Sequence, residues 1–201
     1  MSQLKAALQQ LASGGIISIP TETVYGLAVD AENVEAIERL YACKARPEHK
    51  PLAIALQNPE DIERWVTSIT PDTRILIAAF WPGPLTLVLP AKPHVSTRIT
   101  AGKNTIGIRC SSAPLLQAII HEFGKALCLT SANISGQTDL CTPENITEQF
   151  GQEIYVLTEE QPASGKPSTV LDLTCKPYRL LREGNITKHM LEALLQTTIT
   201  S

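Results

Sequence analysis

The 201-residue sequence predicts an α/β fold in one domain, residues 1–201, in which helices flank a mixed β-sheet. Short apolar runs rich in β-branched residues alternate with segments whose apolar residues recur at helical spacing. Proline and glycine mark most boundaries between these segments. No internal repeat and no long linker divides the chain, which is long enough to bury a substantial core.

The first 56 residues contain two predicted helices and two predicted buried strands. Ser2 is placed to cap the first helix. Residues 16–19 predict a buried strand, and Pro20 ends it because proline cannot donate to a central ladder. A turn rich in hydroxyl groups follows. Asn33 is placed to cap the second helix, and residues 52–56 predict the next strand.

The rest of the chain continues this alternation. Helices are predicted to begin where a capping residue precedes proline, at Asn58, Thr70, Ser112 and Thr142, and a last helix covers residues 188–195. Strands are predicted over residues 85–89, 105–109, 126–129, 154–157, 170–173 and 178–181. Residues 159–166 lack periodicity and predict a loop.

Composition narrows the class of protein. A net charge of −3 is unlike that of a dedicated nucleic-acid-binding domain, which is usually basic. The longest apolar run, residues 75–81, is too short to cross a bilayer, and the N-terminus lacks the apolar core of a signal peptide. We therefore expect a cytoplasmic protein without membrane contact. Five scattered cysteines and four dispersed histidines predict neither a disulfide framework nor a metal site.

A cationic segment follows the second predicted helix. Lys44, Arg46 and Lys50 fall within seven residues, where the helix gives way to Arg46-Pro47. Three cations at one helix exit favour a clamp for a polyphosphate, because guanidinium and ammonium groups bind phosphate oxygens. The alternative is a solvated surface cluster.

Several blocks of the sequence, in order, resemble the YrdC-like family of threonylcarbamoyl-AMP synthases. The first two are Pro20-Thr-Glu-Thr-Val-Tyr-Gly26 and Lys44-x-Arg46-Pro47-x-x-Lys50-Pro51-Leu52. The later blocks are Trp81-Pro-Gly-Pro-Leu-Thr86, Thr105-Ile-Gly-Ile-Arg109, Thr130-Ser-Ala-Asn-Ile-Ser-Gly136, Pro167-Ser-Thr-Val170 and Leu181-Arg182-x-Gly184. The resemblance implies an open, twisted sheet with a concave basic cleft, in the short, single-domain form of the family.

The resemblance also implies a reaction. Such an enzyme joins L-threonine, bicarbonate and ATP into threonylcarbamoyl-AMP and releases pyrophosphate, for the modification of adenosine 37 in tRNA. ATP is then a substrate, and Mg²⁺ is expected with its phosphates. The expected partners are the downstream tRNA threonylcarbamoyl-transferase machinery and, weakly, tRNA itself. The chemistry requires positioning and charge neutralisation more than acid–base catalysis.

Site residues follow from the resemblance by position. Threonine would be held by Thr23, Arg109, Ser131 and Ser168. ATP would be contacted by Arg46, Lys50, Thr105, Asn133 and Arg182. Lys44 and Arg46 would act on the phosphates as the catalytic cations. From the residues alone, the end of a strand at Arg109 equally predicts a structural ion pair.

Several positions depart from the family pattern. Some relatives carry asparagine where Lys50 stands. Some relatives carry histidine where Ala55 aligns, so no threonine contact is assigned there. A further threonine of the ATP site falls at Cys141 or Thr142, and the sequence does not choose between them.

Two other functions compete with the synthase. One is a module that binds double-stranded RNA or tRNA without catalysis, for which the net charge of −3 is unfavourable. The other is a sugar-phosphate lyase on a similar scaffold, for which Glu22 and Asp30 are the available carboxylates.

Overall fold

The computed structural model describes residues 2–140, 142–158 and 164–201, and it shows one twisted sheet with helices on both faces. Its strands are β1 Ile16–Ile19, β2 Gly26–Asp30, β3 Ala53–Leu56, β4 Leu85–Pro90, β5 Thr105–Cys110, β6 Leu127–Ser131, β7 Ile154–Val156, β8 Thr169–Asp172, β9 Tyr178–Arg182 and β10 Ile199–Thr200. Its helices are α1 Gln3–Ala12, α2 Val34–Cys43, α3 Pro71–Phe80, α4 Thr97–Thr100, α5 Pro114–Phe123, α6 Pro143–Phe150 and α7 Lys188–Leu195. Two 3₁₀ turns, Pro59–Arg64 and Gly151–Glu153, complete the described elements.

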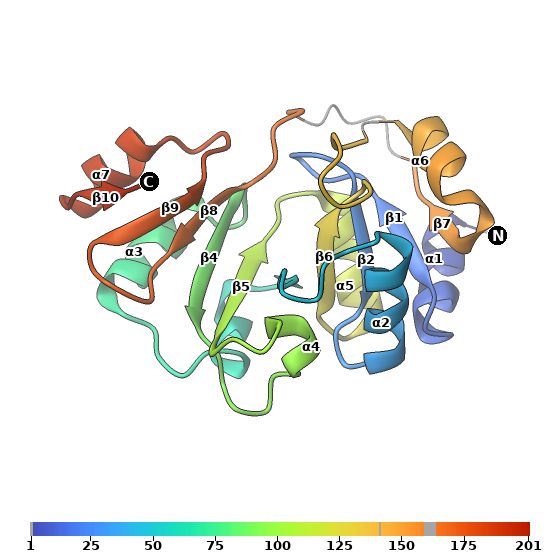
Figure 1. The fold of residues 1–201 in the computed structure, drawn as a ribbon, viewed down its shortest axis with the longest axis horizontal. Helices are drawn as coiled ribbons and strands as arrows, with labels where there is room; N and C mark the ends of the chain where they lie inside the picture. The colour runs from blue at the N-terminus through green and yellow to red at the C-terminus, as the bar shows by residue number, and fades with distance from the viewer. Residues whose placement is uncertain (1, 141, 159–163) are drawn as a thin grey trace.

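The sheet is mixed, as predicted. Its strand order is β10-β9-β8-β4-β5-β3-β6-β2-β1-β7. The β1–β7, β3–β5, β4–β8 and β9–β10 pairs are parallel, and the β1–β2, β2–β6, β3–β6, β4–β5 and β8–β9 pairs are antiparallel. Strand β8, from the last third of the chain, therefore lies inside the sheet beside β4, from the middle third (Figure 1).

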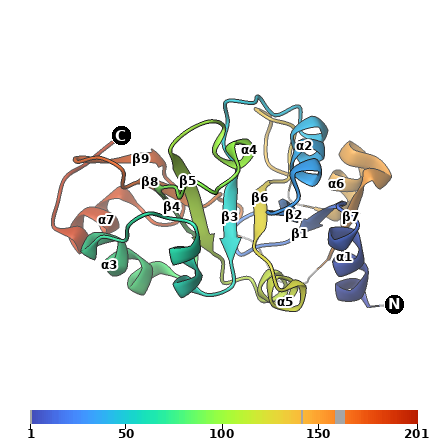
Figure 2. The same cartoon turned by 90° about the horizontal axis from the view of Figure 1, so that it is seen from below.

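The core has two parts. The smaller cluster joins α1 and α5 to one face of β1, β3 and β6, with Leu11, Leu116 and Leu127 fully or almost fully buried. The larger cluster includes Leu40 of α2 and Leu76 of α3. Figure 2 shows α1 and α5 on one face of the sheet and α2 and α4 on the other. Burying apolar side chains on both faces supplies the main driving force for this arrangement.

Helix caps follow the sequence signals. The side chains of Ser2, Asn33, Thr70 and Thr142 accept hydrogen bonds from backbone N–H groups of α1, α2, α3 and α6. The N-cap of α5 lies one residue later than predicted. It is Ala113, whose side chain has no acceptor, and Pro114 is the first residue of the helix.

Five elements differ from the sequence prediction, one of them the 3₁₀ turn Gly151–Glu153, which was not predicted. Strand β2 was not predicted, although it is buried along its whole length. Residues 59–64 form a 3₁₀ helix, and the short helix α4 and strand β10 were also not predicted. Of the expected loop over residues 159–166, only residues 164–166 are among the described residues, and they lie outside any helix or strand.

No helix within the described ranges is both long enough and apolar enough to cross a membrane.

Candidate active site

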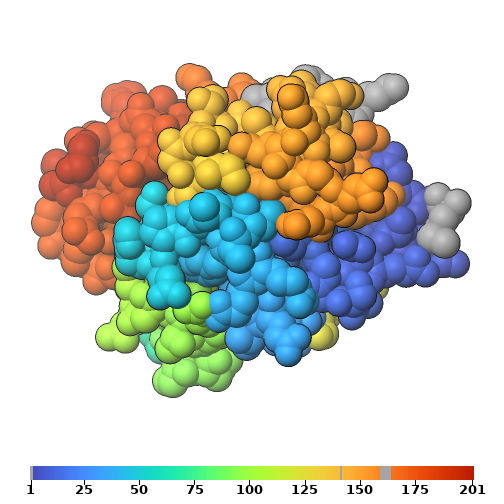
Figure 3. Space-filling model, turned by 45° about the vertical axis from the view of Figure 1, so that its right-hand side comes forward, coloured from blue at the N-terminus to red at the C-terminus, as the bar shows by residue number. Residues whose placement is uncertain are grey.

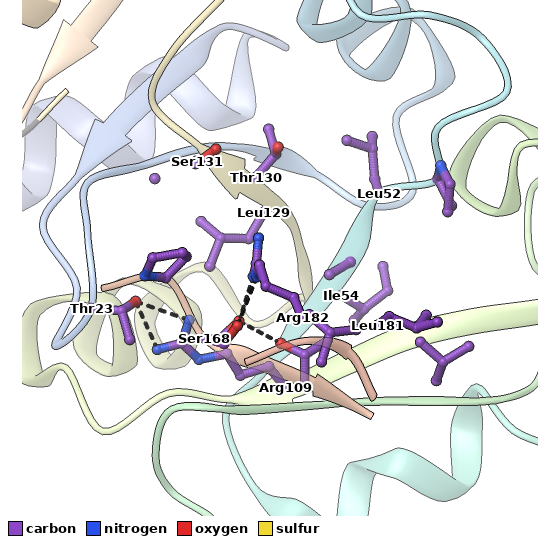
Figure 4. A pocket seen from close by; sticks show the side chains of 18 of the residues that line it. Thr23, Leu52, Ile54, Arg109, Leu129, Thr130, Ser131, Ser168, Leu181 and Arg182 are labelled. Carbon is purple, nitrogen blue, oxygen red and sulfur yellow. Dashed lines mark hydrogen bonds between the residues drawn. The ribbon is translucent and has the colours of Figure 1, made fainter. Parts of the chain in front are cut away.

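A cavity of about 520 Å³ opens near the middle of the sheet. Strands β3, β4, β5 and β6 contribute to its lining, together with β8, β9 and the connection between β1 and β2. Figure 4 shows side chains from these separate segments turned toward one space. Its size falls within the range of small-molecule sites.

At one end of the cavity, Arg109 is held against Thr23. Both terminal nitrogens of the Arg109 guanidinium lie 3.1 Å from Thr23 Oγ1, and Nε donates to the Gly83 carbonyl at 3.2 Å (Figure 4). The Thr21 hydroxyl donates to the Val24 carbonyl at 2.6 Å, so the Thr23 hydroxyl must donate to Thr21 Oγ1, 2.9 Å away. Thr23 Oγ1 thus presents its lone pairs to Arg109, and both side chains are fixed before a ligand arrives.

Ser168 lies beside them, directly before β8. Its hydroxyl is 2.9 Å from Thr86 Oγ1 and accepts from Arg182 Nη2 at 3.0 Å, and its carbonyl accepts from Arg182 Nε at 2.8 Å (Figure 4). Burial lowers the pKa of Arg182, and the nearby Arg109 charge adds to this, whereas Asp139 opposes it. Two guanidinium groups therefore face one end of the cavity, which favours an anionic ligand there.

Arg46 enters the cavity from the segment after α2. Its Nη2 donates to the Pro51 carbonyl at 2.6 Å and its Nε to the Lys50 carbonyl at 3.1 Å. Lys50 is exposed, with Nζ 3.5 Å from Ser135 Oγ. Figure 3 shows this segment, in cyan, against the loop that follows β6, in yellow.

Unlike Arg46 and Lys50, the Lys44 side chain points into the protein interior. It is 1% exposed, and Nζ donates to the Ser131 carbonyl at 2.5 Å, the Asn133 carbonyl at 2.5 Å and Asn133 Oδ1 at 3.0 Å. Asn133 also accepts from the Ser131 hydroxyl at 2.8 Å and donates to the Gln137 carbonyl at 2.5 Å. Lys44 therefore supports the Ser131–Asn133 turn from inside the protein.

Most of the residues that the sequence placed in a site line this one cavity: Thr23, Arg46, Thr105, Arg109, Ser131, Ser168 and Arg182. Three of the predicted residues do not line the cavity. Lys44 and Asn133 are buried behind the lining, and the exposed Lys50 lies at its rim. Ala55 is buried in the smaller core cluster. Cys141 lies outside the described residues, and the Thr142 hydroxyl caps α6.

Several lining residues were not predicted from the sequence. Thr86 and Asp172 face the cavity together with two cations, Lys103 and Arg179, and Arg179 Nη2 pairs with Asp172 Oδ2 at 2.8 Å. The period-two spacing of Ser168, Val170 and Asp172 along β8 was the available signal for Asp172, because alternate residues of a strand share a face. No group of three or more His, Cys, Asp or Glu side chains gathers in a metal-binding arrangement among the described residues.

Comparison with known proteins identifies the family. The Sua5/YciO/YrdC family model, whose description is "Telomere recombination", matches residues 9–184. The chain belongs to this family. A Vibrio vulnificus threonylcarbamoyl-AMP synthase is 36% identical over 187 residues, which are 92% of this chain and 100% of the relative. A Bacillus subtilis protein of the same name is 35% identical over 195 residues, 96% of this chain but 56% of that relative.

Solved structures of Sua5/YciO/YrdC proteins confirm the fold. The structure of Pyrococcus abyssi Sua5 complexed with L-threonine matches with a TM-score of 0.92 and 32% identity, covering 99% of this chain and 60% of that one. Escherichia coli YciO matches with a TM-score of 0.82 and 25% identity, over 92% and 91% of the two chains. The enzyme name of the relatives supports the catalytic function over the RNA-binding alternative.

Proposed function

We propose that this chain is a threonylcarbamoyl-AMP synthase, which condenses L-threonine, bicarbonate and ATP and releases pyrophosphate. One observation carries the proposal: in a member of this family, residues between 23 and 182 in the sequence converge on one cavity with guanidinium groups along its length. A cavity of about 520 Å³ has the size of a site for a small organic substrate.

Threonine would occupy the end of the cavity at Thr23, Arg109 and Ser168. The positive charge of Arg109 favours the α-carboxylate, and the hydroxyls of Thr23, Ser131 and Ser168 offer polar partners for the rest of the amino acid. Most of the Arg109 N–H groups are already engaged within the protein. The carboxylate would therefore share or replace the Thr23 contact.

The reaction joins three molecules in two steps. The threonine amine adds to the carbon derived from bicarbonate, and loss of water gives a carbamate. A carbamate oxygen then attacks the α-phosphorus of ATP, and pyrophosphate leaves with the electrons of the broken P–O bond. The enzyme contributes by holding these reactants together and by stabilising charge on the phosphates.

ATP would extend along the cavity from Arg182 toward Arg46 and Thr105, with Lys50 reaching in from the rim. Mg²⁺ would arrive on the phosphates and keep much of its water shell, since this ion is usually bound by one or two carboxylates plus substrate phosphates. Lys44 and Asn133 would act through the Ser131–Asn133 turn, Lys44 by holding the turn and Asn133 by fixing its shape, and Arg46 would touch the phosphates directly.

The product is a mixed anhydride, which reacts readily with nucleophiles. We propose that a tRNA threonylcarbamoyl-transferase machinery in the cytoplasm consumes it, with the threonylcarbamoyl group passing to adenosine 37. Weak direct binding of tRNA by this chain belongs to the same proposal.

Pyrophosphate release with each substrate omitted in turn tests the function. Release should require ATP, L-threonine and bicarbonate together. Pyrophosphate release that does not depend on threonine would indicate a generic nucleotide hydrolase and overturn the proposal.

A pair of arginine variants tests the placement of ATP. Arg46→Ala should lower kcat/KM for ATP by about a hundredfold, the scale of losing one preorganised charge contact. Arg64→Ala, at an exposed arginine on the 3₁₀ turn Pro59–Arg64, is the matched control and should keep wild-type turnover. Equal activity of the two variants would remove Arg46 from the ATP site.

A further inference from the structure

The carboxylate of Glu22 contacts Arg109 from outside the cavity. Glu22 lies in the β1–β2 connection, and its Oε1 is 2.8 Å from Arg109 Nη2. The two side chains are 20% and 8% exposed, so the ion pair is largely shielded from water. Arg109 lines the cavity and Glu22 does not. Arg109 therefore faces the cavity that would hold a ligand, whereas Glu22 lies on its other side, within the protein.

Glu22 is itself fixed by two further donors. The Ser112 backbone N–H donates to Oε1 at 3.1 Å, and the Ser111 hydroxyl donates to Oε2. Burial disfavours the charged form of Glu22, but the Arg109 charge and the hydrogen bonds from Ser111, Arg109 and Ser112 outweigh it, so the pKa of Glu22 is lowered. Glu22 thus remains an anion whose position is set by the start of the β5–α5 connection.

The donors of Arg109 can be assigned one by one. Its Nε–H goes to the Gly83 carbonyl, and its terminal nitrogens reach Glu22 once and Thr23 twice. A guanidinium has five N–H groups, so these contacts leave one of them on Nη1. The edge of the guanidinium toward Glu22 and Gly83 is held by charged and carbonyl acceptors, and the edge toward Thr23 by a neutral hydroxyl that a carboxylate can outcompete.

Resting on the proposed function, we propose that Glu22 is a positioning residue that fixes the Arg109 guanidinium for the α-carboxylate of L-threonine. Glu22 acts from the side opposite the ligand and does not touch it. Without the charge of Glu22, only Gly83 and Thr23 would hold the Arg109 guanidinium. The α-carboxylate of threonine would then have to order the guanidinium on binding, which would lower its affinity.

Glu22→Gln tests this inference, because glutamine preserves the shape and removes the charge. Calorimetry should show L-threonine affinity about tenfold weaker and ATP affinity unchanged. The preference for L-threonine over L-threoninamide, whose neutral amide replaces the carboxylate, should fall by a similar factor. The matched control is Glu35→Gln, at an exposed glutamate in the first turn of α2, and it should change none of these quantities.

The outcomes separate the alternatives. Unchanged or tighter threonine binding by Glu22→Gln, an unchanged preference over the amide, or a parallel loss of ATP affinity would each overturn the positioning role. If Glu22→Gln does not fold, Ser111→Ala removes one of the donors to Glu22 and should weaken threonine binding about threefold without affecting ATP; unchanged binding would overturn the inference. Wild-type protein that binds no L-threonine would instead overturn the proposed function, and this inference with it.

Discussion

Lys44 carries a charge at a place that solvent barely reaches. It is 1% exposed, and its ammonium group has an acceptor for each of its three N–H groups, all in the Ser131–Asn133 turn. Burial lowers its pKa to about 8, and repulsion from Arg46 contributes. The charged form satisfies every acceptor, whereas a neutral amine has two N–H groups for the same three acceptors and directs a lone pair at an oxygen.

This geometry predicts that activity decreases at high pH, which gives the pH profile a descending limb. In the wild type, kcat/KM should fall as pH rises through about 8, because deprotonation of Lys44 removes one support of the turn. The limb in kcat should lie at higher pH, because bound phosphates favour the charged ammonium. Pyrophosphate release measured across pH gives both profiles.

Two substrate groups, the threonine amine and bicarbonate, also titrate. A variant is therefore needed to show that the fall in kcat/KM near pH 8 comes from Lys44. Lys44→Met should be less active and should lack the limb near pH 8. A limb that persists unchanged in Lys44→Met would belong to a substrate and would contradict the role given to Lys44.

At the scale of elements, the sequence predicted those whose signals are local. Helix α2 lies where Asn33 caps a periodic segment, and α3 where Thr70 precedes proline. Strand β2 was missed because its five residues follow the conspicuous turn after Pro20 and owe their conformation to β1 and β6 on either side. Strand β10, two residues long, depends likewise on its pairing with β9.

The candidate site shows the same division. The position of Arg109 at the end of a strand was evident from the sequence, but its contacts with Glu22, Thr23 and Gly83 depend on how three segments meet. Lys103, in the connection before β5, has no sequence signal that separates it from other surface lysines. Long-range strand pairing decides which of these side chains face the cavity.

Gly184 tests how two elements pack together. It lies just after β9, against the backbone of the residues that lead into β8. A Cβ there would lie 2.1 Å from the Pro167 carbonyl oxygen and 2.8 Å from the Thr169 nitrogen. Gly184→Ala should therefore displace Ser168. Its expected cost in unfolding free energy is about 1–3 kcal/mol, with a several-fold loss of threonine affinity. Denaturant titration and calorimetry measure the two effects.

Gly124→Ala is the control for that substitution. Gly124 caps α5 at a φ of 73°, and a Cβ there would meet nothing within 4 Å. Alanine should cost about 1 kcal/mol through backbone strain alone and leave threonine binding intact. If Gly184→Ala behaves no differently from Gly124→Ala, the close packing at Gly184 does not place Ser168.

At the scale of the whole molecule, the cavity lies where the two halves of the sheet meet. Its walls come from Thr23 and Arg46 in the first quarter of the chain and from Ser168 and Arg182 in the last. A bound ligand therefore adds contacts between segments that β3, β4, β5 and β8 otherwise join through pairing and packing. Unfolding of the chain separates these segments, so ligand binding is linked to global stability.

This linkage predicts distinct stability changes for the two substrates. A ligand at a hundred times its Kd should raise the free energy of unfolding by about 2.7 kcal/mol, and thermal denaturation should report the rise as a higher Tm. Arg46→Ala should lose most of the shift with ATP and keep the shift with L-threonine, whereas Arg109→Ala should do the reverse. Comparing each variant with and without ligand cancels its own change in stability. Equal losses of both shifts in both variants would mean that threonine and ATP do not occupy separate ends of the cavity.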